Sequence, residues 1–174
     1  RTVNVGRRLE ARDFAIRAAD GATTMNAAVL RPFHWNEDFL TERLPVVDGE
    51  VQRDAGRLIT KWSVIDRYRG DGAVAAMFWT GCGPADPETA LACSVAHDSH
   101  TIWSVGSDDA AMAIAVNRLS EMQGGWARVH GGRLVAEVRL EIAVLRTALP
   151  AAALDEAMQA FYAAAAKVQW IYRL

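Results

Sequence analysis

The fold is decided by residues 107–140, which read SDDAAMAIAVNRLSEMQGGWARVHGGRLVAEVRL. The first half of this stretch predicts a helix, because apolar residues recur at helical spacing. They are Met112, Ala115, Val116, Leu119 and Met122. Ser107 is the expected N-cap, and the two aspartates after it would lie in the first turn, where carboxylates favour the helix dipole. The glycine pair at 124–125 is expected to end the helix.

The second half of the stretch predicts a β-hairpin that turns at the glycine pair 131–132. With those two residues in the turn, His130 faces Arg133 and Val129 faces Leu134. Strict alternation would then place one set of small and aliphatic side chains on a single face. They are Ala127, Val129, Leu134, Ala136, Val138 and Leu140.

The remaining chain predicts further strands and one more helix. Strands are expected at residues 9–16, 25–30 and 58–65, hairpin turns at 48–49 and 71–72, and a loop at 81–84. Pro150 opens an alanine-rich helix with an apolar stripe of Leu154, Met158, Phe161, Ala165 and Val168. Since strands dominate, the two helices come late and no βαβ repeat is present, residues 1–174 are expected to form one α+β domain. We expect a strand-rich mixed or antiparallel sheet with both helices packed on it.

Composition limits the classes of function. The 174 residues carry 19 basic and 21 acidic side chains, a net charge of −2, which argues against binding nucleic acid or an anionic membrane through bulk charge. No apolar run approaches the ~18 residues of a membrane span. The two cysteines, Cys82 and Cys93, form no CxxC pair, so a cytoplasmic location is expected.

A polar heptapeptide at residues 94–100, SVAHDSH, interrupts two apolar segments. In an extended strand Asp98 could contact His100 and orient its imidazole. The alternative is a hydrogen-bonded turn, in which Asp98 and Ser99 bond local backbone amides. Convergence of His97 with His100 on one metal would need a turn or a helix, and no third or fourth ligand is evident. No metal site is therefore predicted in this chain.

Other candidate sites carry weaker signals. His34 lies in an aromatic loop, and His130 is expected at the surface beside its turn. Arg67 and its neighbours come directly after a strand, where they could bind an anion or form a solvated strand end. The zinc deaminase signature, the phosphate-binding loop and the serine nucleophile elbow are all missing from the sequence.

The heptapeptide and several segments downstream of it resemble a known family. Residues 94–100, then 105–106, 108–109 and 115–117 leading into 124–125, are similar to the C-terminal domain of bacterial adenine deaminase. The upstream strand WSVIDRY at 62–68 also resembles the family, and the similarity covers about residues 25–170. Three departures stand out, one of which is Arg146, where a methionine is common. Thr101 replaces a usual asparagine, and a turn that usually contains glycine reads Ala143-Val144, where a positive φ would be strained.

The resemblance implies hydrolysis of adenine to hypoxanthine and ammonia in purine salvage. In this family a divalent metal, manganese or iron, makes hydroxide from water on a preceding (β/α)₈ barrel of the same protein. This chain has no H-x-H pair of the kind that opens such a barrel, so the metal is expected there and not here. Adenine, the barrel domain and a second copy in a homo-oligomer are the expected partners.

The resemblance assigns supporting roles at the heptapeptide. We expect His97, Asp98 and His100 to face the mouth of the barrel or the seam between the domains, with Asp98 orienting His100. Ser94 and Ser99 would fix the loop. Adjacent to the substrate we expect these two serines together with Thr101 and Arg67. The alternative hypothesis is a non-catalytic module that binds purines or serves oligomerisation.

Overall fold

The computed structural model describes residues 2–31, 38–96, 99–166 and 170–172. The strands are β1 (Thr24–Arg31), β2 (Asp38–Val47), β3 (Glu50–Val51), β4 (Ile59–Ile65), β5 (Val74–Thr80), β6 (Cys82–Pro84), β7 (Thr89–Cys93), β8 (Ile102–Gly106), β9 (Gly125–His130), β10 (Arg133–Arg139) and β11 (Trp170–Tyr172). The helices are α1 (Asp109–Met122) and α2 (Ala151–Ala166), and a 3₁₀ turn, η1 (Ala11–Phe14), precedes the first strand.

One large mixed sheet organises the described residues. Nine strands are arranged in the order β10-β9-β7-β8-β4-β5-β1-β2-β3, while β6 and β11 form a separate two-stranded sheet. All neighbours in the large sheet are antiparallel except β1 and β5, which run parallel. The predicted α+β class with a strand-rich mixed sheet is confirmed.

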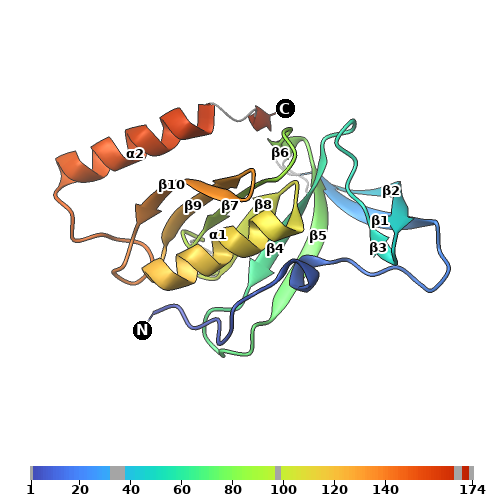
Figure 1. Ribbon diagram of the computed structural model, residues 1–174, viewed down its shortest axis with the longest axis horizontal. Helices are drawn as coiled ribbons and strands as arrows, with labels where there is room; N and C mark the ends of the chain where they lie inside the picture. The colour runs from blue at the N-terminus through green and yellow to red at the C-terminus, as the bar shows by residue number, and fades with distance from the viewer. Residues whose placement is uncertain (1, 32–37, 97–98, 167–169, 173–174) are drawn as a thin grey trace.

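The two helices cover opposite faces of the sheet. Along β7, Ala90 and Ala92 pack in the cluster that contains α1, whereas Leu91 packs in the cluster that contains Phe161 of α2. Because successive side chains of a strand point to opposite faces, α1 and α2 lie on different sides. Figure 1 shows α1 lying across β7 to β9, with α2 beside β10.

Helix α1 forms as its spacing predicted, with a shifted cap. All five stripe residues are buried in the α1 cluster. The N-cap is Asp108, whose carboxylate accepts a hydrogen bond from the amide of Ala111 at 2.7 Å. The prediction of Ser107 was wrong by one residue, since its hydroxyl instead donates to the carbonyl oxygen of Asp86 at 2.7 Å. Gln123 ends the helix in the left-handed conformation, just before the predicted glycine pair.

The predicted hairpin exists, but its face assignment was wrong beyond the turn. His130 pairs with Arg133 and Val129 with Leu134 as expected. A β-bulge then shifts the register, so that Val138 lies opposite Trp126 and packs under α2, while Ala127 packs under α1. A bulge adds one residue to a strand and reverses which side chains face each side of the sheet.

The earlier part of the chain is partly as predicted. The strands at 25–30 and 58–65 are confirmed as β1 and β4, and the hairpin turn at 48–49 is confirmed between β2 and β3. Residues 71–72 lie in the hairpin connection between β4 and β5, but that connection spans residues 66–73 and is not a two-residue turn. The predicted strand at 9–16 was wrong, because residues 11–14 form η1. The predicted loop at 81–84 was also wrong, since residues 82–84 pair with 170–172. Residue 168 of the second apolar stripe lies outside the described residues.

A strained turn lies directly after β10. Ala143 and Val144 have φ values of 52° and 61°, and the amide of Leu145 donates to the Ile142 carbonyl oxygen at 3.2 Å. Both central residues of a type I′ turn require a positive φ, which is rare for a β-branched residue. The sequence suggested that a positive φ at Ala143 and Val144 would be strained, and both residues do have a positive φ.

Candidate functional site

Several connections gather at one end of the sheet, which we call the loop end. Ile65 at the end of β4 lies opposite Ile102 at the start of β8, and Cys93 at the end of β7 lies opposite Trp126. The connections adjoining these residues therefore share this end. They are residues 66–73, the histidine loop (94–101), residues 123–124 and residues 140–146. The N-terminus and the turn after β4 lie at the same lower edge in Figure 1.

The described part of the histidine loop is a turn and not an extended strand. The amide of His100 donates to the carbonyl oxygen of Ala96 at 2.7 Å, and its φ is 55°. The Ser99 hydroxyl lies 2.8 Å from the Thr101 hydroxyl, and Ser99 and His100 are exposed. His97 and Asp98 lie outside the described residues, and with them the expected contact of Asp98 with His100.

Ser94 anchors the base of the histidine loop. Its side chain is fully buried, its hydroxyl donates to the Val144 carbonyl oxygen at 2.8 Å, and it accepts from the Gly125 amide at 2.8 Å. One serine thus ties the loop to the start of β9 and to the strained turn. Because its hydrogen-bonding capacity is used within the domain, the contacts of Ser94 are structural.

Arg67 binds the other side of the loop. Its Nε donates to the carbonyl oxygen of His100 at 2.6 Å and its Nη1 to the carbonyl oxygen of Thr2 at 2.6 Å. Its Nη2 lies 2.7 Å from the Tyr68 hydroxyl, which in turn donates to the His100 oxygen at 3.0 Å. Only 8% of Arg67 is exposed, so the predicted solvated strand end was wrong for this residue.

The other two histidines give no site in the described structure. His34 lies outside the described residues. His130 is exposed as predicted, at the far end of β9, where its Nδ1 lies 2.8 Å from the Thr89 hydroxyl.

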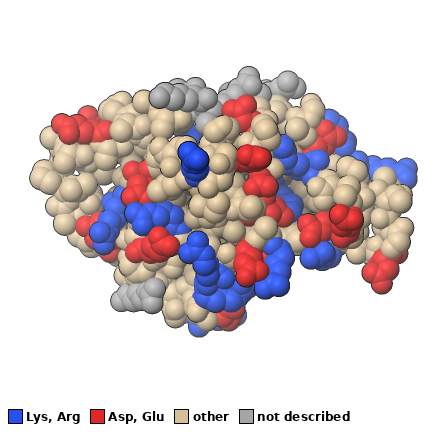
Figure 2. All heavy atoms as spheres, viewed as in Figure 1, with Lys and Arg blue, Asp and Glu red and all other residues tan. Residues whose placement is uncertain are grey.

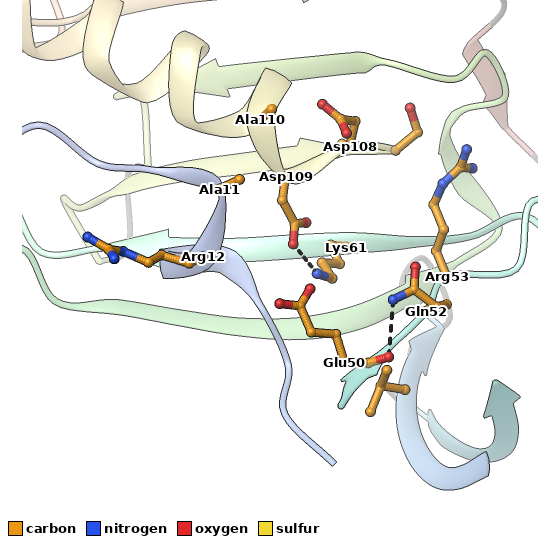
Figure 3. Close-up of a pocket in the computed structure, with 12 residues that line it drawn as sticks. Ala11, Arg12, Glu50, Gln52, Arg53, Lys61, Asp108, Asp109 and Ala110 are labelled. Atoms are coloured by element: carbon orange, nitrogen blue, oxygen red, sulfur yellow. Dashed lines mark hydrogen bonds and ion pairs between the residues drawn. The ribbon is translucent and has the colours of Figure 1, made fainter. Parts of the chain in front are cut away.

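A pocket of about 300 Å³ lies towards the opposite end of β8, between η1, the segment after β3 and the start of α1 (Figure 3). At its wall the ammonium of Lys61 contacts the carboxylate of Asp109 at 2.5 Å and the Phe14 carbonyl oxygen at 3.2 Å. Its charged lining comprises Arg12, Arg53, Lys61, Glu50, Asp108 and Asp109, three cationic and three anionic groups. The balance gives the pocket no net charge to attract an ion of either sign.

Burial dominates the electrostatics of the pocket wall. Desolvation raises the pKa of Asp109, and the Lys61 ammonium opposes that rise. Desolvation also lowers the pKa of Arg53, against the opposing effect of the Asp108 carboxylate. The ion pair of Lys61 and Asp109 fixes the first turn of α1 onto β4. This structural role explains why the two charges are buried here, and no ligand is needed to explain them.

Sequence reasoning missed the Lys61–Asp109 pair. The available signal was that Lys61 is one of two lysines in the chain and is the one charged residue in the strand 59–65. A lysine at such a place needs a buried anion. Its partner is 48 residues away, so local spacing does not identify it.

The described residues do not fit a divalent metal. Within them, no group of three or more His, Cys, Asp or Glu side chains could hold one. Burial raises the pKa of Cys93 to about 12, so the thiolate that a metal requires is disfavoured there. On the face shown in Figure 2, cationic and anionic side chains are interspersed, in agreement with the near-neutral net charge. No helix among the described residues is long and apolar enough to cross a membrane.

Fold and site together define a strand-rich α+β domain whose polar loop is anchored at its base and presented at one end of the sheet. The chain belongs to the adenine deaminase C-terminal domain family, which residues 37–172 match. It is 58% identical over 172 residues to adenine deaminase 2 of Bradyrhizobium diazoefficiens, covering 99% of this chain and 28% of that protein. It is 58% identical to adenine deaminase 1 of a second Bradyrhizobium species over 171 residues, covering 98% of this chain and 27% of the relative. It is 56% identical to adenine deaminase 2 of a Jannaschia species over 171 residues, covering 98% of this chain and 27% of that relative. The chain thus spans little more than a quarter of the length of these relatives.

Proposed function

We propose that this chain is the C-terminal domain of an adenine deaminase, which hydrolyses adenine to hypoxanthine and ammonia in purine salvage. The support is the family match over residues 37–172 and the identity of 58% to a protein named adenine deaminase 2. The relatives are much longer than this chain, so the catalytic metal, manganese or iron, belongs to the part of the parent protein outside it. We place the parent in the cytoplasm as a homo-oligomer.

The histidine loop is the part of the domain that meets the catalytic barrel. The observation that carries this proposal is the contrast within the loop. Ser94 is fully buried and hydrogen-bonded at the base, whereas Ser99 and His100 are exposed at the tip. A polar tip held by a rigid base is how binding residues are commonly presented on a scaffold.

The surroundings of the loop favour a domain seam at this end. Tyr68, Ile142 and Leu145 are large apolar side chains with exposed fractions of 54%, 47% and 39%. Exposed apolar side chains beside polar ones are typical of a surface that another domain covers. The loop end therefore offers both the apolar contact and the polar groups that a seam requires.

Each candidate residue keeps a supporting role in this proposal. His97, Asp98 and His100 would line the mouth of the active site, with Asp98 orienting His100. Ser94 and Ser99 fix the loop, and Thr101 lies next to the exposed tip through its bond to Ser99. None of these residues is assigned to bind the metal.

The experiment compares this chain with the complete gene product that carries it. Ammonia release from adenine and the metal content are measured for both. We expect turnover and bound metal only in the complete product, whose reading frame should encode the barrel with its H-x-H pair. Ammonia release by this chain alone, or none by the complete product, would overturn the proposal, and the latter result would favour a non-catalytic purine-binding or oligomerisation module.

A further inference from the structure

We propose that Arg67 is a positioning residue that couples the N-terminal segment, residues 2–8, to the histidine loop. It acts through the backbone of His100 and not by contact with substrate. This inference rests on the proposed function for its catalytic consequence. Its structural part stands on the contacts of the guanidinium alone.

The first observation is the environment of the Arg67 charge. The residue is more than nine-tenths buried, and its three hydrogen-bond partners are all neutral oxygens, those of His100, Thr2 and the Tyr68 hydroxyl. The Tyr68 ring lies 4.2 Å from the guanidinium carbon, at cation–π distance. Within the part of the chain that the structure describes, Arg67 forms no ion pair. Among the described residues the buried cation is thus held by neutral acceptors, which is costly, and we infer that the cost is offset by the geometry that Arg67 imposes on its partners.

The second observation is what the guanidinium joins. Thr2 is 65 residues from Arg67 in the sequence and His100 is 33 residues away, yet both carbonyl oxygens accept from the same planar group. A guanidinium presents several donors in a fixed fork, whereas an ammonium acts as a single point charge. Arginine can therefore hold both backbone segments in one geometry, which lysine cannot reproduce.

The third observation concerns the N-terminal segment itself. The amide of Thr2 donates to the side-chain oxygen of Gln123 at 3.0 Å, and that of Asn4 donates to the carbonyl oxygen of Arg67 at 2.8 Å. Gly6 has a φ of 87°, and an added Cβ there would lie 1.9 Å from the Gly70 carbonyl oxygen. The segment is thus seated closely on the turn that carries Arg67.

The position of the N-terminal segment indicates what Arg67 connects in the parent protein. The family is a C-terminal domain, so the longer part of the relatives precedes the region that this chain matches. In the parent protein the preceding region continues into residues 2–4. Arg67 binds this entry segment with one nitrogen and the histidine loop with another. The loop is thereby held in a defined position relative to the domain that enters beside it.

Burial also separates this role from the substrate contact expected for Arg67. A side chain with 8% exposure, whose Nε, Nη1 and Nη2 all have partners, offers little to an incoming purine. A positioning residue should change the rate of the bound complex, whereas a substrate contact should change binding.

The test uses the complete gene product with Arg67→Lys, and with Tyr68→Phe as the milder variant, which removes the hydroxyl that bridges Arg67 and the His100 carbonyl oxygen. Arg69→Lys is the matched control, because Arg69 is largely exposed and pairs only with Asp66 and Asp71 among the described residues. Two quantities are measured, the hydrogen exchange of amides 99–101 and the separate values of kcat and KM for adenine.

For Arg67→Lys we expect amide exchange in the loop to quicken about tenfold and kcat to fall about tenfold, with KM within about twofold of wild type. Tyr68→Phe should give smaller changes in the same direction, and Arg69→Lys none. Unchanged loop exchange, or a raised KM at constant kcat, would overturn the positioning role. If the wild-type product does not deaminate adenine, the proposed function fails, and the exchange measurement alone still decides the coupling of the loop to Arg67.

Discussion

The hydroxyl of Ser94 donates to the carbonyl oxygen of Val144 at 2.8 Å, across fifty residues of sequence. This contact joins the base of the histidine loop to the strained turn after β10. It explains how a polar side chain is accommodated with no exposed surface, since the same hydroxyl also accepts from the Gly125 amide.

Ser94→Ala should therefore destabilise the chain by about 2 kcal/mol, because it leaves a buried amide and a buried carbonyl without that partner. Ser99→Ala is the matched control, since that serine is exposed and bonds only Thr101 among the described residues. Its expected effect is within about 0.5 kcal/mol. Urea unfolding of both variants measures the difference, and equal effects would contradict the anchoring role of Ser94.

The turn at Ala143 offers a stabilising substitution. Its φ of 52° is one that glycine adopts freely, and its side chain is exposed. Ala143→Gly should raise the free energy of unfolding by about 1 kcal/mol through relief of this strain. Ala110→Gly, at an exposed position in the first turn of α1, should lower it by about 0.5–1 kcal/mol. If Ala143→Gly instead lowers the free energy of unfolding, as Ala110→Gly should, the turn is not strained.

The ion pair of Lys61 and Asp109 should show strong coupling. Lys61→Met removes the cation from a carboxylate that is only 19% exposed, and is expected to cost about 3 kcal/mol. Asp109→Asn alone should also destabilise, but the double variant should cost less than the sum of the two by about 1 kcal/mol or more. A double-mutant cycle in urea gives this coupling energy, and a value near zero would mean that the pair does not fix α1 to β4.

Stability should fall in acid partly through Asp66. The backbone amides of Arg69 and Tyr68 donate to its carboxylate and hold the pKa of Asp66 below its ordinary value of 3.8. A lowered pKa in the folded state stabilises the protein above the unfolded value, and this contribution is lost as the pH falls through the folded value. Asp66→Ala should thus be less stable than wild type at pH 7, with a difference that shrinks below about pH 4.

Urea midpoints between pH 7 and pH 2 measure this dependence. Asp20→Ala, which removes a carboxylate from an exposed turn, provides the control. A difference between wild type and Asp66→Ala that stays constant over the whole range would mean that the Asp66 carboxylate has an ordinary pKa.

Local signals were sufficient to predict part of this fold. The α1 stripe and the glycine turn of the β9–β10 hairpin each depend on residues close in sequence, and both are present. The bulge at Val135 was not predictable in the same way, because apolar side chains lie on both faces of β10 and alternation does not reveal the shifted register. The strand at 82–84 depends on residues 170–172, a partner that no local pattern indicates.

The candidate site was predictable in position but not in structure. The polar heptapeptide indicated where the loop lies, since five polar residues between buried strands need a special environment. Its turn conformation, and the burial of Arg67 beneath it, arise from contacts with Thr2 and His100 that are distant in sequence. Long-range hydrogen bonds of this kind leave no periodic signal.

The central claim is that the exposed tip of the histidine loop serves the catalytic domain of the parent protein. The measurement that tests it most directly is adenine turnover by His100→Ala in the complete gene product, taken with the unfolding temperature. His130→Ala is the control, because that histidine is exposed at the far end of β9. We predict that His100→Ala lowers kcat about tenfold or more with the unfolding temperature within about 2 °C of wild type, while His130→Ala leaves turnover unchanged. Full turnover by His100→Ala would contradict the claim. A fall in turnover that is fully explained by a lower unfolding temperature would contradict it as well.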